Sequence, residues 1–334
     1  MLNLNIQGAR QAKLPAFIRP QLATLADSVP RGRGWLHEIK FDGYRILCRI
    51  EKRRVSLLTR EAKDWTARFK SVADAAAGLP VTGTILDGEV VALRADGTTD
   101  FQALQNSLRR GGGANLTYFV FDLLYLNGYD LTAIPLLSRK DALAKILESR
   151  DTVGALRYSE HWIDQGETLF EQSCRMGLEG VVSKRADQPY RPGRSRDWLK
   201  VKCLKGQEFV VGGFTDPAGS RTGFGALLLG FYDAAGSLHY AGRVGTGFNS
   251  RSLSELRSRL DDLTIHSTPF VNPPTGVDVR GVHWVKPQLV CEVVFTGWTE
   301  DGLLRHPSFK GLREDKAPRE IRREEALPLN RRSR

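Results

Sequence analysis

The sequence contains no apolar segment long enough to cross a bilayer. A transmembrane helix needs about 20 consecutive apolar residues, and no run approaching that length occurs among the 334 residues of the chain. The first residues, MLNLNIQGARQAKLP, also lack the apolar stretch of a signal peptide. We therefore expect a cytoplasmic protein with no membrane partner.

Cysteine is scarce, and its spacing argues against the common zinc modules. The chain has four cysteines and no Cys-x-x-Cys pair, whereas zinc fingers and ribbons need closely spaced ligand pairs. In a cytoplasmic protein we expect such thiols to be reduced and mostly buried. The four residues are Cys48, Cys174, Cys203 and Cys291.

Acidic residues are fewer than basic ones, and the excess suggests a polyanionic partner. Lysine and arginine number 49 against 38 for aspartate and glutamate, which gives a net charge of +11 and a pI of about 9.6. For a soluble protein of this size, nucleic acid is the first candidate partner. A merely basic surface is the alternative, and the composition leaves both open.

The length and the apolar pattern predict two domains. A chain of 334 residues, 41% of them hydrophobic, can form two ordinary cores. Up to about residue 205, strands alternate with helices. Beyond it, short apolar strands and glycine turns surround one helix at 252–263, which fits a small five-stranded barrel. We place the domains at 15–205 and 206–325, between tails at 1–14 and 326–334.

Local signals set the expected element boundaries. Prolines predict a poorly ordered start over residues 1–30, and the charges from Arg313 onward predict an exposed C-terminus. Ser138 is expected to cap one helix, and Asp164 and Glu167 to form a capping box for another. A further helix is expected at 65–76, and Asp100 is expected to cap a short one. The expected strands are 35–39, 44–50, 55–60, 84–93, 118–124, 179–185 and 198–202.

Lys40 occupies a tight bend between two of these strands, in the stretch HEIKFDGYR. Gly43 supplies the bend. An ammonium group fixed on rigid elements beside a small loop suits a lysine that attacks a substrate. Taken alone, however, the pattern Lys-x-Asp-Gly is a weak signal, because many loops contain it by chance.

Two carboxylates stand at or near the ends of apolar strands. Glu89 lies in LDGEV, and Glu179 begins EGVVSK. Two separated carboxylates can hold a hard divalent ion such as Mg²⁺, which prefers oxygen ligands and bridges to phosphates. A pair of surface acids at strand ends is the alternative for either segment alone.

Lys200 and Lys202 lie two residues apart on an expected strand, WLKVK, so they point to the same side. Two like charges on one face repel unless an anion lies between them, and phosphate is the obvious anion. The alternative is a solvated edge strand protected by lysines. With Lys40 and the two carboxylates, the lysines suggest attack on the α-phosphate of a nucleotide, with pyrophosphate as the leaving group.

The order of these segments resembles the covalent nucleotidyltransferases, which include DNA ligases, RNA ligases and mRNA capping enzymes. Within that superfamily it is most similar to bacterial ATP-dependent DNA ligases, in particular the ligase domain of the ligase D type. The resemblance implies an α+β fold, with an ATP-grasp-like adenylation domain of antiparallel sheets followed by a small OB-fold barrel. It is carried by HEIKFDGYR, LDGEVVAL, FVFDLLYLNG, EGVVSKR, WLKVK and RHPSFKGLREDK.

The resemblance also implies roles for individual residues. Lys40 matches the adenylated nucleophile, and nearby cations are expected to lower its pKa. Glu38 lies where the family meets the adenine, and Phe121 where a ring stacks on it, with Tyr118 and Phe119 as rivals. Implied nucleotide or phosphate contacts are Arg45, Arg60, Glu89, Lys184, Arg194, Lys200 and Lys202, the implied metal ligands are Glu89 and Glu179, and the implied closure motif of the barrel is Arg313, Asp315 and Lys316.

The function implied by this resemblance is ATP-dependent sealing of 5′-phosphate/3′-hydroxyl nicks in duplex DNA. ATP and Mg²⁺ (or Mn²⁺) are the implied cofactors, and the bacterial nucleoid is the implied place of action. A monomer is expected, with a Ku-type end-binding protein as a candidate partner. The chain lacks the other domains of full ligase D proteins, which implies a stand-alone minimal ligase or an excised module. An RNA ligase or GTP-using capping enzyme and an inactive DNA-binding module are the alternatives.

Overall fold

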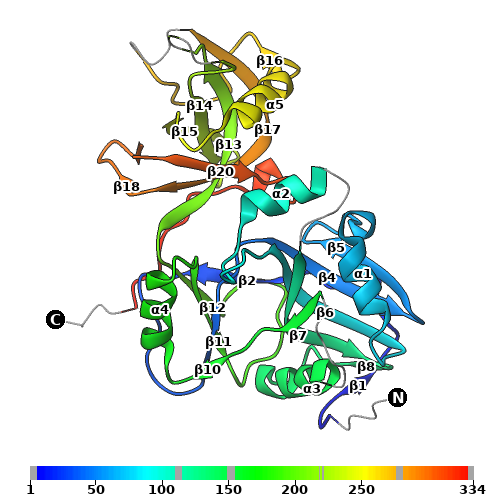
Figure 1. The fold of residues 1–334 in the computed structure, drawn as a ribbon. Helices are drawn as coiled ribbons and strands as arrows, with labels where there is room; N and C mark the ends of the chain where they lie inside the picture. The colour runs from blue at the N-terminus through cyan, green and yellow to red at the C-terminus, as the bar shows by residue number, and fades with distance from the viewer. Residues whose placement is uncertain are drawn as a thin grey trace, which may run out of the picture. The chain divides into compact units, whose positions relative to one another are not determined.

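The computed structural model describes residues 6–109, 115–148, 155–217, 219, 222–275 and 281–329. The chain forms two compact units, which can be followed by colour in Figure 1. The first unit consists of Met1–Cys203 together with Glu325–Arg334, and the second of Leu204–Glu324. The chain therefore leaves the first unit after residue 203 and returns to it at residue 325.

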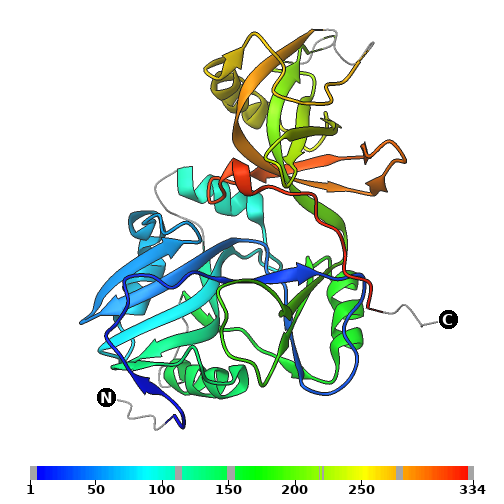
Figure 2. The same ribbon diagram turned by 180° about the vertical axis from the view of Figure 1, so that it is seen from behind.

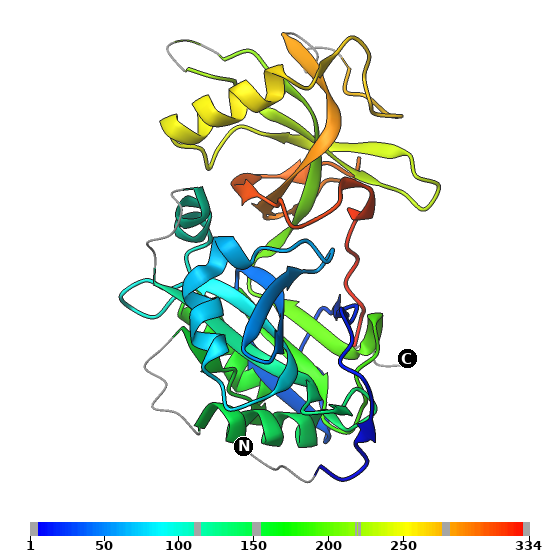
Figure 3. The ribbon, with the colours of Figure 1, turned by 90° about the vertical axis from the view of Figure 1, so that its right-hand side faces the viewer.

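The larger sheet of the first unit is mostly antiparallel. Its strand order is β1-β8-β7-β6-β4-β5, and β9 pairs with β7 in parallel. One side of its central strands shares a core with helices α1, α2 and α3, which can be followed in Figure 3. The strands are β1 (Arg10–Gln11), β4 (Tyr44–Glu51), β5 (Arg54–Thr59), β6 (Gly83–Ala92), β7 (Leu116–Leu126), β8 (Tyr129–Asp130) and β9 (Leu156–Tyr158), and the helices are η1 (Thr66–Phe69), α1 (Lys70–Ala77), α2 (Phe101–Arg109) and α3 (Leu136–Glu148).

Alternation along β4 decides which side chains reach the core. Tyr44 and Ile46 are buried in it, so Arg45 between them points to the opposite face. Glu89 of β6 is the direct cross-strand partner of Arg45 and shares that face. The strands expected between residues 35 and 93 are found within one residue of their predicted bounds.

The smaller sheet of the first unit has the order β10-β3-β11-β12-β2. Its pairs are antiparallel except for β12 and β2, which run in parallel. Helix α4 (Gly166–Arg175) packs on one face, where Phe170 contacts a core that contains Trp35, Leu199 and Val201. The strands are β10 (Trp162–Ile163), β3 (Trp35–Ile39), β11 (Gly180–Arg185), β12 (Gly193–Lys202) and β2 (Gln21–Leu25).

The N-terminal segment is more ordered than predicted over its described residues, and a segment near the C-terminus pairs with it. Residues 21–25, expected in a poorly ordered start, form β2, and residues 10–11 form β1. The backbone N–H of Leu327 donates to the carbonyl of Leu25 at 2.8 Å, so the C-terminal segment extends the smaller sheet beyond β2 (Figure 2). Leu327 and Leu329 also pack against the core under α4, which explains why this segment belongs to the first unit.

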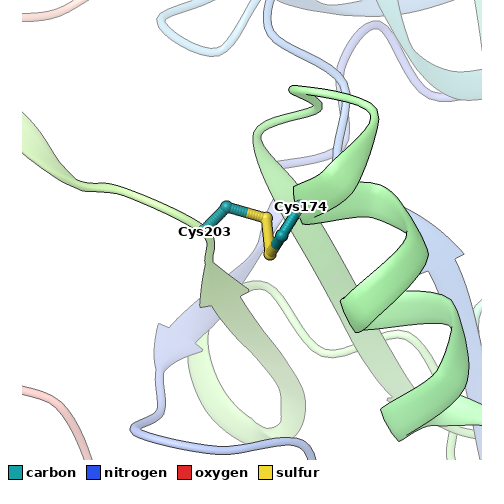
Figure 4. Close-up of a disulfide and its surroundings, with 2 residues drawn as sticks. All are labelled: Cys174 and Cys203. Carbon is teal, nitrogen blue, oxygen red and sulfur yellow. A yellow bond between two sulfur atoms is a disulfide. The ribbon is translucent and has the colours of Figure 1, made fainter.

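The expectation that all four cysteines are reduced is wrong for one pair. Cys174, at the end of α4, forms a disulfide with Cys203, which directly follows β12 (Figure 4). The two residues are separated by 29 positions in the sequence. Cys48 and Cys291 are free and buried, as predicted.

Two of the predicted helix starts are also wrong. Asp164 has a φ of +60°, which is incompatible with the extended conformation of an N-cap, and Gln165 occupies the cap without a side-chain hydrogen bond. Helix α3 begins before Ser138, and carbonyls of residues 186 and 188 accept from its first N–H groups. Asp100 does cap α2, through a 2.9 Å bond from the N–H of Ala103. None of the helices in the described ranges is long and apolar enough to span a membrane.

The second unit has a sheet with the order β15-β14-β13-β17-β16, and β20 pairs with β17. Its helix α5 (Ser250–Asp261) is capped by Asn249 and Ser252 in a capping box, and so begins two residues before the expected position. The strands are β13 (Lys205–Thr215), β14 (Leu227–Tyr232), β15 (Leu238–Val244), β16 (Thr264–Ile265), β17 (Val282–Phe295), β18 (Gly297–Trp298), β19 (Leu304–Arg305) and β20 (Ser308–Leu312), followed by η3 (Pro318–Glu320).

Candidate active site

The smaller sheet brings three predicted site residues to one end. The backbone N–H of Lys40, just after β3, donates to the carbonyl of Gly180 at 2.9 Å, and Gly180 is paired with Lys202. Glu179 directly precedes β11. Because β11 is antiparallel to both β3 and β12, the end of β3, the start of β11 and the end of β12 coincide. The predicted nucleophile, carboxylate and lysine therefore meet there.

Gly43 is required after Lys40 by a close backbone approach. A Cβ atom at this position would lie 2.2 Å from the carbonyl oxygen of Val90 on β6, far inside van der Waals contact. The smaller sheet and the larger sheet are joined here, because β3 continues through Gly43 into β4. The glycine thus allows the chain to pass between the two sheets at the site.

Lys40 is paired with Glu179, with 2.5 Å between Nζ and Oε2, and both side chains are about one-fifth exposed. Burial acts to lower the pKa of the Lys40 amine, as does the charge of Lys202, but Glu179 outweighs them and the pKa lies above its ordinary value. The expectation that cations lower this pKa is therefore wrong for the ligand-free protein, although Lys202 acts in the predicted direction.

Two further rows of paired residues lie on the same face of the smaller sheet, at increasing distance from Lys40. Glu38 is paired with Val182, and Val182 with Lys200. Glu38 and Lys200 therefore lie two residues along their strands from the row of Lys40, at about 7 Å from it. Two residues further along, Lys184 is paired with Trp198. Lys200 and Lys202 thus share one face as predicted.

Glu38 is the centre of a buried ionic network. Its carboxylate accepts from Nζ of Lys140 at 2.9 Å, Oγ of Ser159 at 2.9 Å and Nζ of Lys184 at 3.0 Å. Burial acts to raise the pKa of Glu38, but the two lysines outweigh it and the pKa falls below its ordinary value. Burial lowers the pKa of Lys184 to about 8, against the opposing charge of Glu38.

Lys140 was not predicted as a site residue, although the pattern of α3 indicates a buried charge at this position. It falls on the apolar stripe of α3, between Leu136 and Leu143, and is fully buried. A charged residue in a buried stripe requires a buried partner. Lys184 was expected near phosphates, but the structure places its amine against Glu38 and above the Phe121 ring, at 4.2 Å from the centroid.

The three aromatic candidates for adenine stacking differ in their surroundings. Tyr118 is fully buried, and its hydroxyl donates to the carbonyls of Ile46 and Leu86, so it is a core residue. Phe119 is half-buried and stacks on Phe41 with 4.0 Å between centroids. Phe121 is 9% exposed. Its role as the adenine platform stays a prediction.

Arg45 extends from β4 on the face that it shares with Glu89, and Asp87 holds it. Its Nε and Nη2 donate to the two oxygens of Asp87 at 2.9 and 2.6 Å. Tyr190 donates its hydroxyl to the same carboxylate at 2.7 Å. Asp87 and Tyr190 were not predicted as site residues, although Asp87 lies in the segment LDGEV that the sequence singled out.

The remaining predicted nucleotide contacts lie farther out. Arg60 directly follows β5, with Nε 3.7 Å from Oε1 of Glu61. Arg194 lies at the start of β12, eight residues from Lys202, and is exposed. An extended strand covers roughly 3.3 Å per residue, so Arg194 is at the opposite end of β12 from Lys202. Both assignments stay predictions.

The carboxylates expected to hold a metal come from different sheets. Glu89 belongs to β6 and Glu179 precedes β11. Across the ranges that the structure describes, no group of three or more His, Cys, Asp or Glu side chains is arranged to hold a metal ion.

The predicted closure motif of the barrel is buried in ion pairs. Arg313 donates to both oxygens of Asp315 at 2.9 Å and to Glu292 at 3.0 Å, and Lys316 pairs with Glu208. Asp315 is 2% exposed. The expectation of an exposed C-terminus from Arg313 onward is therefore wrong for these residues, because β17 and β13 supply carboxylates to them.

The chain matches two parts of a known family. Residues 20–202 match the family described as "ATP dependent DNA ligase domain", and residues 220–316 match "ATP dependent DNA ligase C terminal region". The chain belongs to the ATP-dependent DNA ligase family. The family that the motifs predicted is thus confirmed, as are the α+β fold and the OB barrel. Enzymes of this family use ATP as the nucleotide.

The chain is similar to several curated proteins. The "Multifunctional non-homologous end joining protein LigD" of Pseudomonas aeruginosa is 45% identical over 310 residues, which cover 92% of this chain and 37% of the relative. The corresponding DNA repair protein of Mycobacterium tuberculosis is 38% identical over 87% of this chain and 37% of its own length. The chain therefore spans well under half the length of these curated relatives.

Solved structures show the same ligase fold. A mycobacterial DNA ligase D complexed with ATP is 35% identical, with a TM-score of 0.67 over 91% of this chain and 98% of the other. The ligase domain of M. tuberculosis LigD is also 35% identical, with a TM-score of 0.51 over the same shares.

Proposed function

We propose that this ATP-dependent DNA ligase seals 5′-phosphate/3′-hydroxyl nicks in duplex DNA through a lysyl-AMP intermediate. The Lys40 amine attacks the α-phosphate of ATP and releases pyrophosphate. AMP then passes to the 5′-phosphate, and the 3′-hydroxyl displaces AMP to close the strand. The observation that carries this proposal is the meeting of Lys40, Glu179 and Lys202 at one end of the smaller sheet.

The surroundings of Lys40 suit phosphate chemistry. Lys200 and Lys202 point to the face on which Lys40 lies, so they can offset the negative charge that develops on the phosphate oxygens. Lys202 also acts to lower the pKa of the Lys40 amine. We infer that Glu38 and Phe121 serve the adenine, and that Arg45, Arg60, Lys184 and Arg194 serve the nucleotide or the 5′-phosphate end.

We infer that Glu89 and Glu179 hold the divalent metal ion of this family, Mg²⁺ or Mn²⁺. The donor set fits, because carboxylate oxygens are hard ligands and Mg²⁺ usually binds through one or two carboxylates together with substrate phosphates. When bound, the ion neutralises charge on the phosphates and orients them. The barrel motif of Arg313, Asp315 and Lys316 is assigned to closure over ATP in the first step.

The proposed cellular role rests on the names of the relatives. Because these are described as end joining proteins, we propose that the chain acts in end joining or break repair at the bacterial nucleoid, as a monomer. Its net charge of +11 supports duplex DNA as the partner. A Ku-type end-binding protein is the proposed protein partner.

Self-labelling with radioactive ATP tests the central assignment. Wild-type protein should take up label from α-³²P-ATP in a bond that acid breaks and alkali preserves, as expected of a phosphoramidate. Lys40→Ala should take up none, whereas Lys70→Ala, which removes a lysine that is 78% exposed in its ion pair, should label normally. Label that persists on Lys40→Ala would contradict the assignment of the nucleophile.

Parallel incubations separate the alternative functions. A capping-type enzyme would label with GTP, and an RNA ligase would join nicks in RNA in preference to nicks in duplex DNA. An inactive DNA-binding module would show no AMP transfer with any nucleotide. We expect labelling with ATP alone among ATP, GTP and NAD, and sealing of a nicked DNA duplex.

A further inference from the structure

The Arg45 guanidinium is held in a closed ring of hydrogen bonds that joins four segments of the chain. Nε and Nη2 donate to Asp87, and Nη1 donates to the carbonyl oxygen of Gln21 at 2.7 Å. The backbone N–H of Gln21 donates to the hydroxyl of Tyr190 at 2.9 Å, and that hydroxyl donates to Asp87 at 2.7 Å. Each member therefore restrains the next.

Breaking this ring would destabilise the folded protein, because two of its members are buried. Asp87 is completely buried and Tyr190 is 4% exposed, so the carboxylate depends on these partners for its stability in the folded protein. Burial, reinforced by Asp87, raises the pKa of Tyr190 well above its ordinary value, so the hydroxyl remains a donor at any working pH. The Arg45 side chain, by contrast, keeps 17% of its surface exposed.

The donor count leaves Arg45 with capacity for a ligand. A guanidinium group has five N–H donors in a fixed plane, and the ring uses one on each of the three nitrogens. Two N–H groups remain, and their direction is set by the ring. Glu89 is the direct cross-strand neighbour of Arg45, so a guanidinium released from the ring has a competing carboxylate within reach.

We propose that Tyr190 is a positioning residue for the ligase reaction: through Asp87 it fixes the Arg45 guanidinium so that its two remaining N–H groups face an anionic oxygen of the nucleotide. This inference rests on the proposed function. The hydroxyl of Tyr190 acts through its ring partners, the backbone of Gln21 and the carboxylate of Asp87. It keeps Asp87 in the bidentate geometry and thereby keeps Arg45 from turning toward Glu89.

Tyr190→Phe is the sharpest test, because it removes a single hydroxyl group. Self-adenylylation is a single turnover, so its rate constant is measured against ATP concentration. The apparent KM, which is the ATP concentration at half the maximal rate constant, should rise on the order of tenfold, as for the loss of one well-placed interaction worth 1.4 kcal/mol. The maximal rate constant should change little. Tyr129→Phe, at an exposed tyrosine in β8, is the matched control and should behave as wild type. A wild-type KM in Tyr190→Phe would overturn the proposal.

A double-mutant cycle with Arg45→Lys separates positioning from a general structural effect. Lysine cannot form the bidentate fork, so Tyr190→Phe should have little further effect on KM in that background. A full Tyr190→Phe effect on top of Arg45→Lys would show that the tyrosine acts independently of Arg45 and would refute the proposal. If Tyr190→Phe does not fold, Asp87→Asn carries the same cycle. Absence of AMP transfer by the wild-type chain would instead count against the proposed function.

Discussion

Reduction of the Cys174–Cys203 disulfide should lower the stability of the first unit by a predictable amount. The bond joins the end of α4 to the residue that follows β12, and it closes a loop that contains Glu179, Lys200 and Lys202. In the chain-entropy account, a cross-link costs the unfolded chain about 2.1 + 1.5R ln n cal/mol/K, with n the number of residues in the loop.

The sequence separation of 29 sets the magnitude. With n of about 30, the entropy is about 12 cal/mol/K, which corresponds to about 3.6 kcal/mol at 25 °C. For a unit of about 200 residues, 1 kcal/mol shifts the melting temperature by about 2–4 °C, so the loss should be about 7–14 °C. Both cysteines are only half-buried, so replacement by serine should add little packing loss.

Differential scanning calorimetry with and without dithiothreitol measures this effect. Only the transition of the first unit should move, and the variant Cys174→Ser/Cys203→Ser should match the reduced wild type and ignore the reductant. Cys48→Ala, which changes a buried free thiol of the same unit, should be less stable but still respond to reductant. An unchanged transition on reduction, or two free thiols at these positions in non-reduced peptide mass spectra, would refute the reasoning.

Two further predictions concern buried charges of the same unit. Arg139→Met should cost about 3–5 kcal/mol of unfolding free energy in urea, because it leaves Asp122 buried without the partner that donates to it at 2.7 and 2.8 Å. Adding Asp122→Leu should recover part of that loss, and a double variant no better than the single one would contradict this. Since the pKa of Lys184 is about 8 in the folded protein and 10.5 in the unfolded chain, the folded state loses this proton first, and unfolding free energy should rise with pH between those values. Lys184→Met should lack the rise, as measured by urea unfolding at pH 7.5 and 10.

Part of the arrangement of Lys40, Glu179 and Lys202 could be predicted from the sequence, namely the strands that carry or adjoin them and the face of the two β12 lysines. Strand alternation predicted that Lys200 and Lys202 share a face, and the bounds of β3 and β11 were right within one residue. Once those strands pair antiparallel, their ends coincide. Local periodicity therefore predicts which side chains share a face, and the pairing of β3, β11 and β12 in the structure brings them together.

The partners that hold the site residues were not predictable in the same way. Glu38 is bonded to Lys140, 102 positions away, and Tyr190 to Asp87, 103 positions away. Such pairs depend on which strands and helices become neighbours, and one charged residue says nothing about the identity of a distant partner. The disulfide was missed for the same reason, because no pattern indicates that the ends of α4 and β12 adjoin.

The pKa of Lys40 shows how one such contact reverses a prediction. Cations near an amine favour its neutral form, and Lys202 does act in that direction. The charge of Arg45, however, is already matched by Asp87, while Glu179 lies 2.5 Å from the Lys40 amine. The charge of Glu179 outweighs that of Lys202, so the pKa of the Lys40 amine is raised in the ligand-free protein. Glu179 is also one of the two proposed metal ligands, so an ion bound there would compete with the Lys40 ammonium for the same carboxylate.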